Sequence, residues 1–308
     1  MSRAKRQTAS YLRRRFTEIG LAPNARHGQN FLIDYNLVEL LAGAGRVEAA
    51  DVVLEIGTGT GALTALIAEQ AAAVVTVELD QYLHQMAREE LESFDNVTML
   101  RQDALKNKNR IDQRVFEALE AAMTQTGSQS FRLVANLPYS IATPLISNLL
   151  RREPVPKSMT VTIQKELADR IMAVPSTKDY SSLSIWMQSL CKIELVRILP
   201  PSVFWPRPKV DSAIIYVEPQ PEWRTKFKDL EFYHTFVRSL FFHRRKFLRS
   251  VVISAFKGQL EKPDVDEVLS QMELGPNARA EELPVERIQE LGELFRLRVE
   301  ALEGGQKK

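Results

Sequence analysis

The sequence is poor in cysteine, in long apolar runs and, over two of its stretches, in acidic residues. The single cysteine, Cys191, excludes an internal disulfide and a zinc cluster, so we expect a reducing compartment and no metal site. No apolar run approaches the ~18 residues that a membrane-spanning helix needs. The basic N-terminus also lacks the apolar core of a signal peptide. These absences predict a cytoplasmic protein with no membrane partner.

The overall composition is that of an ordinary globular protein. The 308 residues are 44% hydrophobic and 26% charged, which excludes wholesale disorder. This length suits one large domain or two modest ones. The 41 lysines and arginines and 39 acids leave a formal net charge of +2, so the total charge alone predicts no polyanionic partner.

The charges are nevertheless segregated along the chain. Residues 1–16 and 232–260 each carry six arginines or lysines and no acid, whereas residues 261–303 carry twelve acids and five bases. Two basic blocks in a neutral chain favour a positive surface that follows a phosphate backbone, although a solvated tail and an ordinary surface helix remain the alternative. In the second block, Arg238, Arg245 and Arg249 recur at spacings of seven and four opposite a broad apolar stripe. This pattern predicts one helix with a core side and a phosphate-binding side.

From residue 52 to 165, short apolar strands alternate with helix-like stretches, the pattern of a parallel α/β sheet. The expected strands span residues 52–56, 73–79, 97–100, 131–135 and 159–163, with two later strands at 192–199 and 212–217. After Pro219-Gln220-Pro221 the pattern is helical to the end. We therefore expect three segments: a basic N-terminal segment (1–25), an α/β domain (26–220) and a helical RNA-binding domain (221–308).

A glycine-rich loop follows the first of these strands and opens a predicted helix. Gly57 and Gly59 let the backbone turn tightly and approach a nucleoside ligand. Glu78 ends the next strand, where an acid can accept hydrogen bonds from both ribose hydroxyls. Asp103 ends the third strand and is suited to accept a bond from the exocyclic amine of adenine. The glycine spacing is compatible with a dinucleotide or with S-adenosylmethionine (SAM), and Glu55 and the two strand-end acids favour SAM.

The tetrapeptide Asn136-Leu137-Pro138-Tyr139 follows the fourth strand and indicates the chemistry. An exocyclic adenine amine is a poor nucleophile because its lone pair is delocalised into the ring. The side-chain oxygen of Asn136 and the backbone carbonyl of Leu137 can accept both of its N–H bonds and favour a nitrogen that attacks. Pro138 fixes the backbone, and Tyr139 offers a ring on which a flipped base can stack.

With these residues in view, the chain resembles the ribosomal RNA adenine dimethyltransferases of the KsgA/Dim type over about residues 26–295. The resemblance rests on the glycine loop and on motifs at residues 27–32, 77–80, 102–104, 136–144, 164–166, 204–212, 244–246 and 278–283. It implies a seven-stranded, Rossmann-like SAM-dependent methyltransferase domain over residues 26–220 and a small all-helical C-terminal domain.

The resemblance also implies roles for individual residues. The cofactor contacts would be Asn30, the backbone of Leu32, Gly57, Gly59, Glu78, Asp103 and Asn136. Phe204 would form a second aromatic wall facing Tyr139, so that the catalytic set is Asn136, Leu137, Pro138, Tyr139 and Phe204. We further expect phosphate contacts from Arg244, Arg245, Lys246 and Arg249.

The expected function is transfer of methyl groups from SAM to N6 of two adjacent adenosines near the 3′ end of the 16S rRNA. The expected partner is the small ribosomal subunit or its pre-30S precursor, and the enzyme is expected to be a monomer. Three alternatives remain. These are an Erm-type large-subunit rRNA methyltransferase, a non-catalytic RNA-binding assembly or transcription factor of the same fold, and a NAD dehydrogenase. Leu137 and the 244–246 motif favour the small-subunit type.

Overall fold

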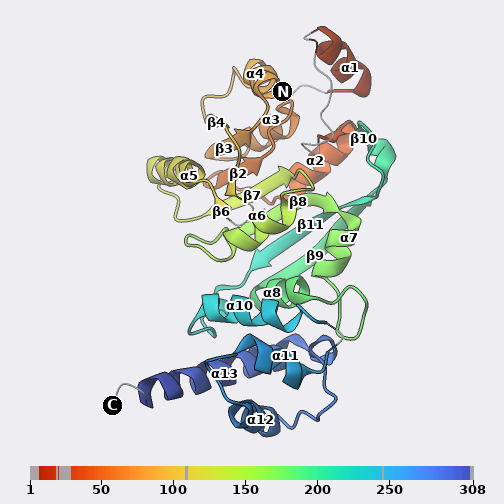
Figure 1. Cartoon of the computed structure of the whole chain (residues 1–308). Coiled ribbons are helices and arrows are strands. Elements are labelled where there is room, and N and C mark those ends of the chain that lie inside the picture. Colours follow the sequence, from red (N-terminus) through yellow and green to blue (C-terminus); the bar gives the residue numbers. More distant parts are fainter. Residues whose placement is uncertain (1–6, 19, 21–28, 108–109, 245, 306–308) are drawn as a thin grey trace. The chain divides into compact units, whose positions relative to one another are not determined.

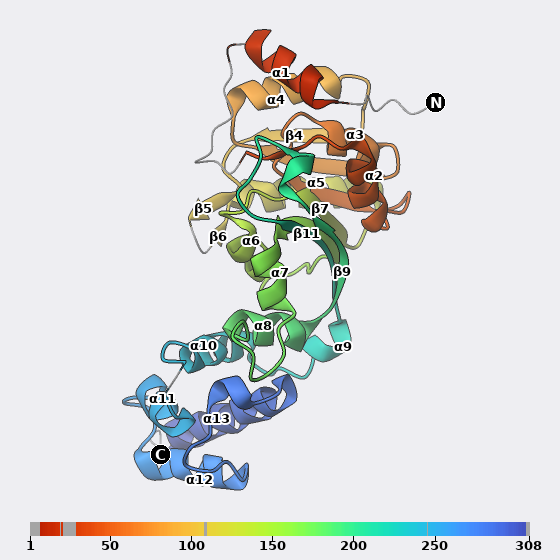
Figure 2. The same cartoon turned by 90° about the vertical axis from the view of Figure 1, so that its right-hand side faces the viewer.

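The computed structural model describes residues 7–18, 20, 29–107, 110–244 and 246–305, and the chain divides into two compact units (Figures 1 and 2). The first unit comprises the chain up to Ala168 together with Ile193–Pro219. The second comprises Asp169–Lys192 and the chain from Gln220 onward. Arg245 and residues 27–28 of the first family motif lie outside the described residues.

The first unit holds a seven-stranded sheet and two short two-stranded sheets. Its strands are β1 (Phe31–Leu32), β2 (Val52–Ile56), β3 (Ala73–Glu78), β4 (Val97–Arg101), β5 (Leu105–Asn107), β6 (Arg110–Ile111), β7 (Phe131–Asn136), β8 (Ser158–Gln164), β9 (Cys191–Leu199), β10 (Phe204–Trp205) and β11 (Ser212–Pro219). Its helices are α1 (Ala9–Glu18), α2 (Tyr35–Ala44), α3 (Ala62–Ala68), α4 (Gln81–Glu90), α5 (Gln113–Thr126) and α6 (Ala142–Leu149), and α7 (Lys165–Ile171) leads into the second unit.

The main sheet has the strand order β4-β3-β2-β7-β8-β11-β9. Strands β2, β3, β4, β7 and β8 are parallel, and β11 runs antiparallel to β8. The chain moves outward from β2 to β4 and then returns to β7 on the other side of β2. A ligand crevice is expected where the strand order reverses, outside the carboxyl ends of the strands. The predicted seven-stranded Rossmann-like fold is confirmed.

Helices α2, α3 and α4 bury one face of this sheet in a common core. Each presents an apolar stripe, with Leu41, Ile67 and Ala87 fully buried against the strand residues Val53 and Val74. Side chains of Asp34 and Asp80 accept backbone N–H bonds at the first turns of α2 and α4, which fixes where these helices begin. The loops at the carboxyl edge therefore stand on a rigid base.

The second unit is helical, and one of its helices comes from an unexpected part of the sequence. It contains α8 (Ser182–Leu190), α9 (Pro221–Arg224), α10 (Leu230–Leu240), α11 (Leu248–Ala255), α12 (Lys262–Gln271) and α13 (Val285–Gly305). The sequence division placed α8 within the domain 26–220. In the structure the Trp186 ring of α8 lies 4.7 Å from the His234 ring of α10, and Ser189 hydrogen-bonds Tyr233 at 2.8 Å. Burial of these side chains assigns α8 to the helical unit.

The prediction of one helix through residues 232–252 is wrong. Helix α10 ends at Leu240 and α11 begins at Leu248, with Phe247 extended between them. This break lets Phe256 pack 6.1 Å from Phe236 and 5.2 Å from Phe295. In one continuous helix, Phe236 and Phe256 would stand about 30 Å apart. Burial of the aromatic cluster outweighs the helical periodicity.

Within the part of the chain that the structure describes, no helix combines the length and the apolar character needed to cross a membrane.

Candidate functional site

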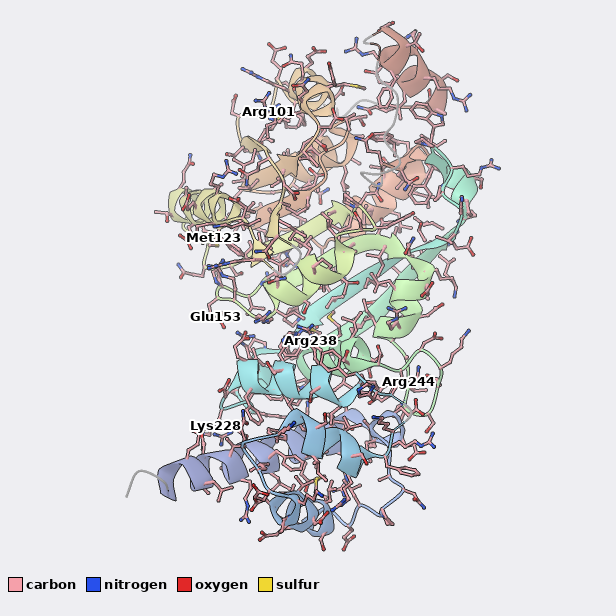
Figure 3. The ribbon with its side chains drawn as sticks, viewed as in Figure 1. Arg101, Met123, Glu153, Lys228, Arg238 and Arg244 are labelled. Atoms are coloured by element: carbon pink, nitrogen blue, oxygen red, sulfur yellow. The ribbon has the colours of Figure 1, made fainter. Side chains whose placement is uncertain are left out.

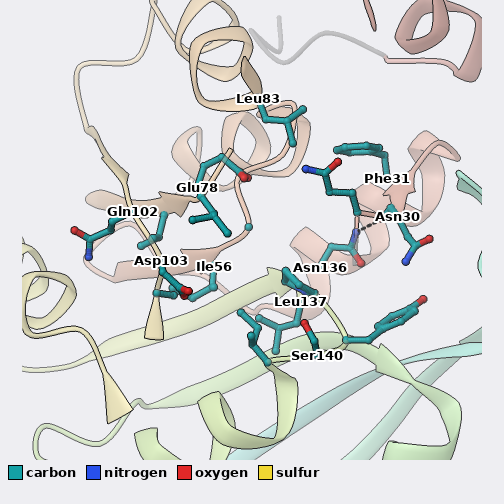
Figure 4. Close-up of a pocket in the computed structure, with 18 residues that line it drawn as sticks. Asn30, Phe31, Ile56, Glu78, Leu83, Gln102, Asp103, Asn136, Leu137 and Ser140 are labelled. Atoms are coloured by element: carbon teal, nitrogen blue, oxygen red, sulfur yellow. Dashed lines mark hydrogen bonds between the residues drawn. The ribbon is translucent and has the colours of Figure 1, made fainter. Parts of the chain in front are cut away.

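A cavity of about 260 Å³ lies at the carboxyl edge of the sheet, where the strand order reverses. Its walls are the ends of β2, β3, β4 and β7, the loops that follow them and the segment around β1 (Figure 4). It is lined by Gln29, Asn30, Phe31, Ile56, Gly57, Val77, Glu78, Leu79, Leu83, Gln102, Asp103, Ala104, Asn136, Leu137, Pro138, Tyr139, Ser140 and Ile141. The structure therefore brings together the strand-end acids and the tetrapeptide that the sequence singled out.

The glycine loop forms the floor of this cavity. Gly57 has φ 87° and Gly59 has φ 57°, in the left-handed region that favours glycine. A Cβ at Gly57 would lie 3.2 Å from Cδ of Pro138, so the loop also packs tightly against the tetrapeptide. Gly57 lines the cavity, whereas Gly59 does not; its N–H donates to Oε2 of Glu78 at 2.8 Å.

Glu55 lies behind the loop rather than in the cavity. Its Oε2 accepts hydrogen bonds of 2.6 Å from the hydroxyls of Thr64 and Thr76, and Thr58 in turn donates to Thr76. Complete burial raises the pKa of Glu55 to about 8. The residue joins β2, β3, α3 and the glycine loop, which is a structural role for the acid that the sequence used to favour SAM.

The buried Glu55 predicts a pH-dependent stability. An unfolded chain releases this proton near pH 4.5, whereas the folded protein holds it to about pH 8, so stability falls as the pH rises through this window. Between pH 6 and pH 8, the wild type should lose roughly 2 kcal/mol more unfolding free energy than Glu55→Gln. Urea unfolding of both proteins across this range measures the difference. Parallel stability profiles would contradict the assignment.

Glu78 and Asp103 point into the cavity from neighbouring strand ends (Figure 4). The two carboxylate oxygens of Glu78 accept backbone N–H bonds from Gly59 at 2.8 Å and from Asp80 at 2.9 Å. Burial raises the pKa of Glu78, although these two bonds oppose the shift. Asp103 accepts a bond from the Leu105 N–H at 2.8 Å. Both carboxylates are thus held in fixed orientations and keep lone pairs for a ligand.

Asn136 ends β7 and faces the same cavity from its other side. Its Nδ2 donates to the carbonyl oxygen of Asn30 at 3.0 Å, drawn as a dashed line in Figure 4. Because the amide nitrogen is engaged, the side chain presents its oxygen as an acceptor. Leu137 is held by a bond from its N–H to the Thr162 carbonyl at 3.2 Å. Two neighbouring acceptors, the Asn136 side chain and the Leu137 backbone, are therefore fixed at one edge.

Tyr139 is oriented by a residue that the sequence reasoning did not assign. Its hydroxyl lies 2.6 Å from the hydroxyl of Ser212, at the start of β11, and burial raises the pKa of Tyr139. Ser212 falls within the family motif at 204–212, which was the available signal. The ring of Tyr139 lines the cavity with its position fixed at the far end.

Phe204 and Leu32 do not line the cavity. They are paired across the β1–β10 ladder, and Phe204 is 3% exposed in the core that α2 shares with the sheet. The aromatic wall and the Leu32 contact stay predictions.

Helix α1 packs behind two residues of the cavity wall, a contact that the sequence reasoning missed. Its Leu12 and Phe16 are buried against the cavity residues Phe31 and Leu83, and the rings of Phe16 and Phe31 meet edge to face at 5.3 Å. Gln7 Nε2 also donates to the Thr60 carbonyl of the glycine loop at 3.1 Å. The sequence signal for this buried helix face was the four-residue spacing of Leu12 and Phe16 within a basic segment.

The basic residues expected to contact RNA differ in whether they form ion pairs within the protein. Arg244, labelled in Figure 3, pairs with Glu281 and donates to the Thr177 carbonyl at 2.7 Å. Arg249 pairs with Asp266 at 2.5 Å. Lys246 is exposed, and Arg245 lies outside the described residues. Two of the four cations are therefore engaged in intramolecular ion pairs.

Comparisons with known proteins identify the family of this chain. A model of the family described as ribosomal RNA adenine dimethylase matches residues 21–292. The ribosomal RNA small subunit methyltransferase A of Clostridium botulinum (strain Loch Maree / Type A3) is 37% identical over 270 residues, which are 88% of this chain and 93% of that protein. The protein of the same name from Caldanaerobacter subterraneus subsp. tengcongensis is 37% identical over 265 residues, 86% of this chain and 94% of the relative.

Solved structures show the same fold. A dimethyladenosine transferase from Plasmodium falciparum superposes with a TM-score of 0.71 at 24% identity, covering 85% of this chain and 96% of the other. The 23S rRNA methyltransferase ErmE superposes with a TM-score of 0.62 at 24% identity, covering 87% and 100%. The family match and the sequence identity extend over most of the chain and confirm the resemblance. The chain therefore belongs to the ribosomal RNA adenine dimethylase family of methyltransferases.

Proposed function

We propose that this enzyme transfers methyl groups from SAM to N6 of two adjacent adenosines near the 3′ end of small-subunit rRNA. The observation that carries the proposal is that Asn136, whose amide nitrogen donates to the Asn30 carbonyl and so leaves its oxygen as the acceptor, lines a cavity shared with Glu78 and Asp103. The names of the relatives, which specify the small ribosomal subunit, support the choice of substrate. We further propose a cytoplasmic monomer that acts on the subunit or its pre-30S precursor.

The cavity residues fit SAM. Each oxygen of Glu78 accepts one backbone N–H and retains a second lone pair, so the carboxylate can accept both ribose hydroxyls. Asp103 and Gly57 also line the cavity, so Asp103 would accept a hydrogen bond from the adenine amine of the cofactor and Gly57 would lie beneath the nucleoside. The bound cofactor would supply an electrophilic methyl group on a cationic sulfur.

The chain's own residues would activate the target amine. Asn136 Oδ1 and the Leu137 carbonyl each accept one N–H of the adenine amine, which favours a tetrahedral nitrogen with a free lone pair. The bound cofactor would supply the methyl group and keep the electron pair of the broken C–S bond on its sulfur, and water would take the proton that the nitrogen loses. Tyr139 would hold the flipped base by stacking. Because both acceptors are fixed before the reaction, they stabilise the transition state without reorganisation.

The hydrogen bond between Tyr139 and Ser212 allows the contribution of the Tyr139 ring to base binding to be measured separately from that of its hydroxyl. Tyr139→Ala should weaken productive binding of the target base by about 5- to 150-fold through loss of stacking. Tyr139→Phe should cost only about 2- to 10-fold, the worth of one hydrogen bond. Ser212→Ala should match Tyr139→Phe, and the double variant should be no worse than either. Measurement of kcat and KM on small subunits checks this, and additive losses would contradict the shared role.

The proposal itself is tested by calorimetric SAM binding and by transfer of labelled methyl groups to purified subunits that lack the modification. Small subunits should be labelled and large subunits should not. Primer extension should then stop at two adjacent adenosines near the 3′ end of the small-subunit rRNA. Labelling of large subunits would favour the Erm-type alternative, and RNA binding without transfer would favour a non-catalytic assembly factor.

We also propose that the 244–249 segment contacts rRNA phosphates. The ion pairs of Arg244 with Glu281 and of Arg249 with Asp266 reduce what these two cations can contribute. Lys246, which is exposed, is then the best placed of the described members of this set.

A further inference from the structure

A groove of about 470 Å³ lies on the helical unit between α10 and α11. It is lined by Thr235, Arg238, Ser239, Phe242, His243, Val251, Ser254 and Ala255. All of these residues belong to the helical unit, so the groove is separate from the cofactor cavity. The break between α10 and α11, which the sequence did not predict, creates it.

Phe242 is the most conspicuous residue of the groove because its side chain is 73% exposed. The buried face of α10 is formed by other residues, among them Tyr233, Phe236 and Leu240, and does not include Phe242. Phe242 instead follows the helix end in a turn, with its N–H bonded to the Ser239 carbonyl at 3.3 Å. An aromatic ring that contributes nothing to the core is available to a ligand.

The arginine of this groove, Arg238, is not neutralised as the neighbouring arginines are. Arg238 lies exposed on α10 (Figure 3) and makes no ion pair with any residue that the structure describes. His243 is exposed at the same groove. Arg244 and Arg249, by contrast, are paired with Glu281 and Asp266. Residues 232–260, which supply every wall of the groove, contain no acid.

We infer that this groove binds one unpaired nucleotide of the rRNA substrate, with its base stacked on Phe242 and its phosphate between Arg238 and His243. An exposed ring flanked by an arginine, a histidine and hydroxyls is a combination suited to single-stranded RNA, because stacking requires a base that is free of its own helix. The inference rests on the proposed function and specifies a second RNA contact, made by the helical unit rather than by the unit that holds the methyl-transfer site.

The test compares full-length variants for binding to a labelled single-stranded RNA oligonucleotide and to the same sequence as a duplex. Phe242→Ala should weaken single-strand binding by about 5- to 150-fold with an unchanged salt dependence, and Phe242→Trp should restore it. Arg238→Ala should instead reduce the slope of log K against log salt by about 0.7, the share of one phosphate. SAM affinity should not change in any variant, because the cofactor cavity lies in the other unit.

Two matched controls lie outside the groove. Phe247 is 42% exposed and has Arg279 over its ring at 5.5 Å, and Arg287 on α13 is paired with Glu290 at 2.7 Å, so alanine at either should leave single-strand affinity within about twofold. Unchanged single-strand affinity of Phe242→Ala would overturn the inference. So would an equal loss for the duplex, or competition by an acidic peptide that is equally sensitive to Phe242. Methyl transfer by the wild type to small subunits, measured alongside, shows whether the proposed function stands independently of this groove.

Discussion

Replacement of Asn136 by alanine is expected to slow methyl transfer by about 10²- to 10³-fold, while binding of rRNA changes little. The reason is that the Asn136 oxygen accepts an N–H bond that strengthens as the amine becomes tetrahedral, so its loss raises the transition state more than the ground state. Single-turnover rates at saturating SAM and saturating small subunits isolate this step from binding.

A matched control is Asn148→Ala on α6. The Asn148 side chain also donates to a backbone carbonyl, that of Pro144 at 2.7 Å, but it lies outside the cavity. It should leave the rate unchanged. Asn136→Asp should fall between the wild type and alanine, because it keeps an acceptor but loses the bond to the Asn30 carbonyl. An alanine variant that methylates at the wild-type rate would remove Asn136 from the mechanism.

Replacement of Glu78 by alanine should weaken SAM binding by about 10- to 150-fold. A hydrogen bond to a charged acceptor contributes about 1.5–3 kcal/mol, and the buried carboxylate is positioned by two backbone N–H groups before any ligand arrives. Titration calorimetry measures the affinity, and RNA binding should stay at the wild-type value.

Glu78→Gln should not rescue this loss. Both carboxylate oxygens accept backbone N–H bonds, so the amide nitrogen of glutamine would face either the Gly59 or the Asp80 donor. Glu117→Ala, on the exposed surface of α5, is the control for removing an acid and should bind SAM normally. SAM affinity that is unchanged in Glu78→Ala would exclude the ribose contact.

The catalytic edge of the fold was predictable because it depends on local rules. The strand β2 has the predicted bounds, and the other predicted strands lie within a few residues of those observed. Strand-end residues of parallel neighbours meet at one edge whatever the rest of the chain does. For that reason Glu78, Asp103 and Asn136 could be brought together from sequence alone.

Features that depend on distant packing could not be read in this way. Periodicity could not reveal the break between α10 and α11, because the partners of Phe256 lie twenty residues before it and thirty-nine after it. The assignment of α8 to the helical unit depends equally on side chains of α10. Phe204 shows the same limit. Its motif shows which position of the family it occupies, but not that packing in the core leaves it only 3% exposed.

Helix α1 has a thermodynamic consequence for the cofactor. Its inner residues Leu12 and Phe16 are buried on Phe31 and Leu83, which are themselves part of the cavity wall. Its outer residues Arg13 and Arg14 are exposed and basic. Detachment of this helix and release of the bound nucleoside are thus linked equilibria, each shifting the other by the same free energy. A polyanion that binds the outer face and stabilises the docked helix would, by that linkage, raise the affinity of the cavity for its ligand.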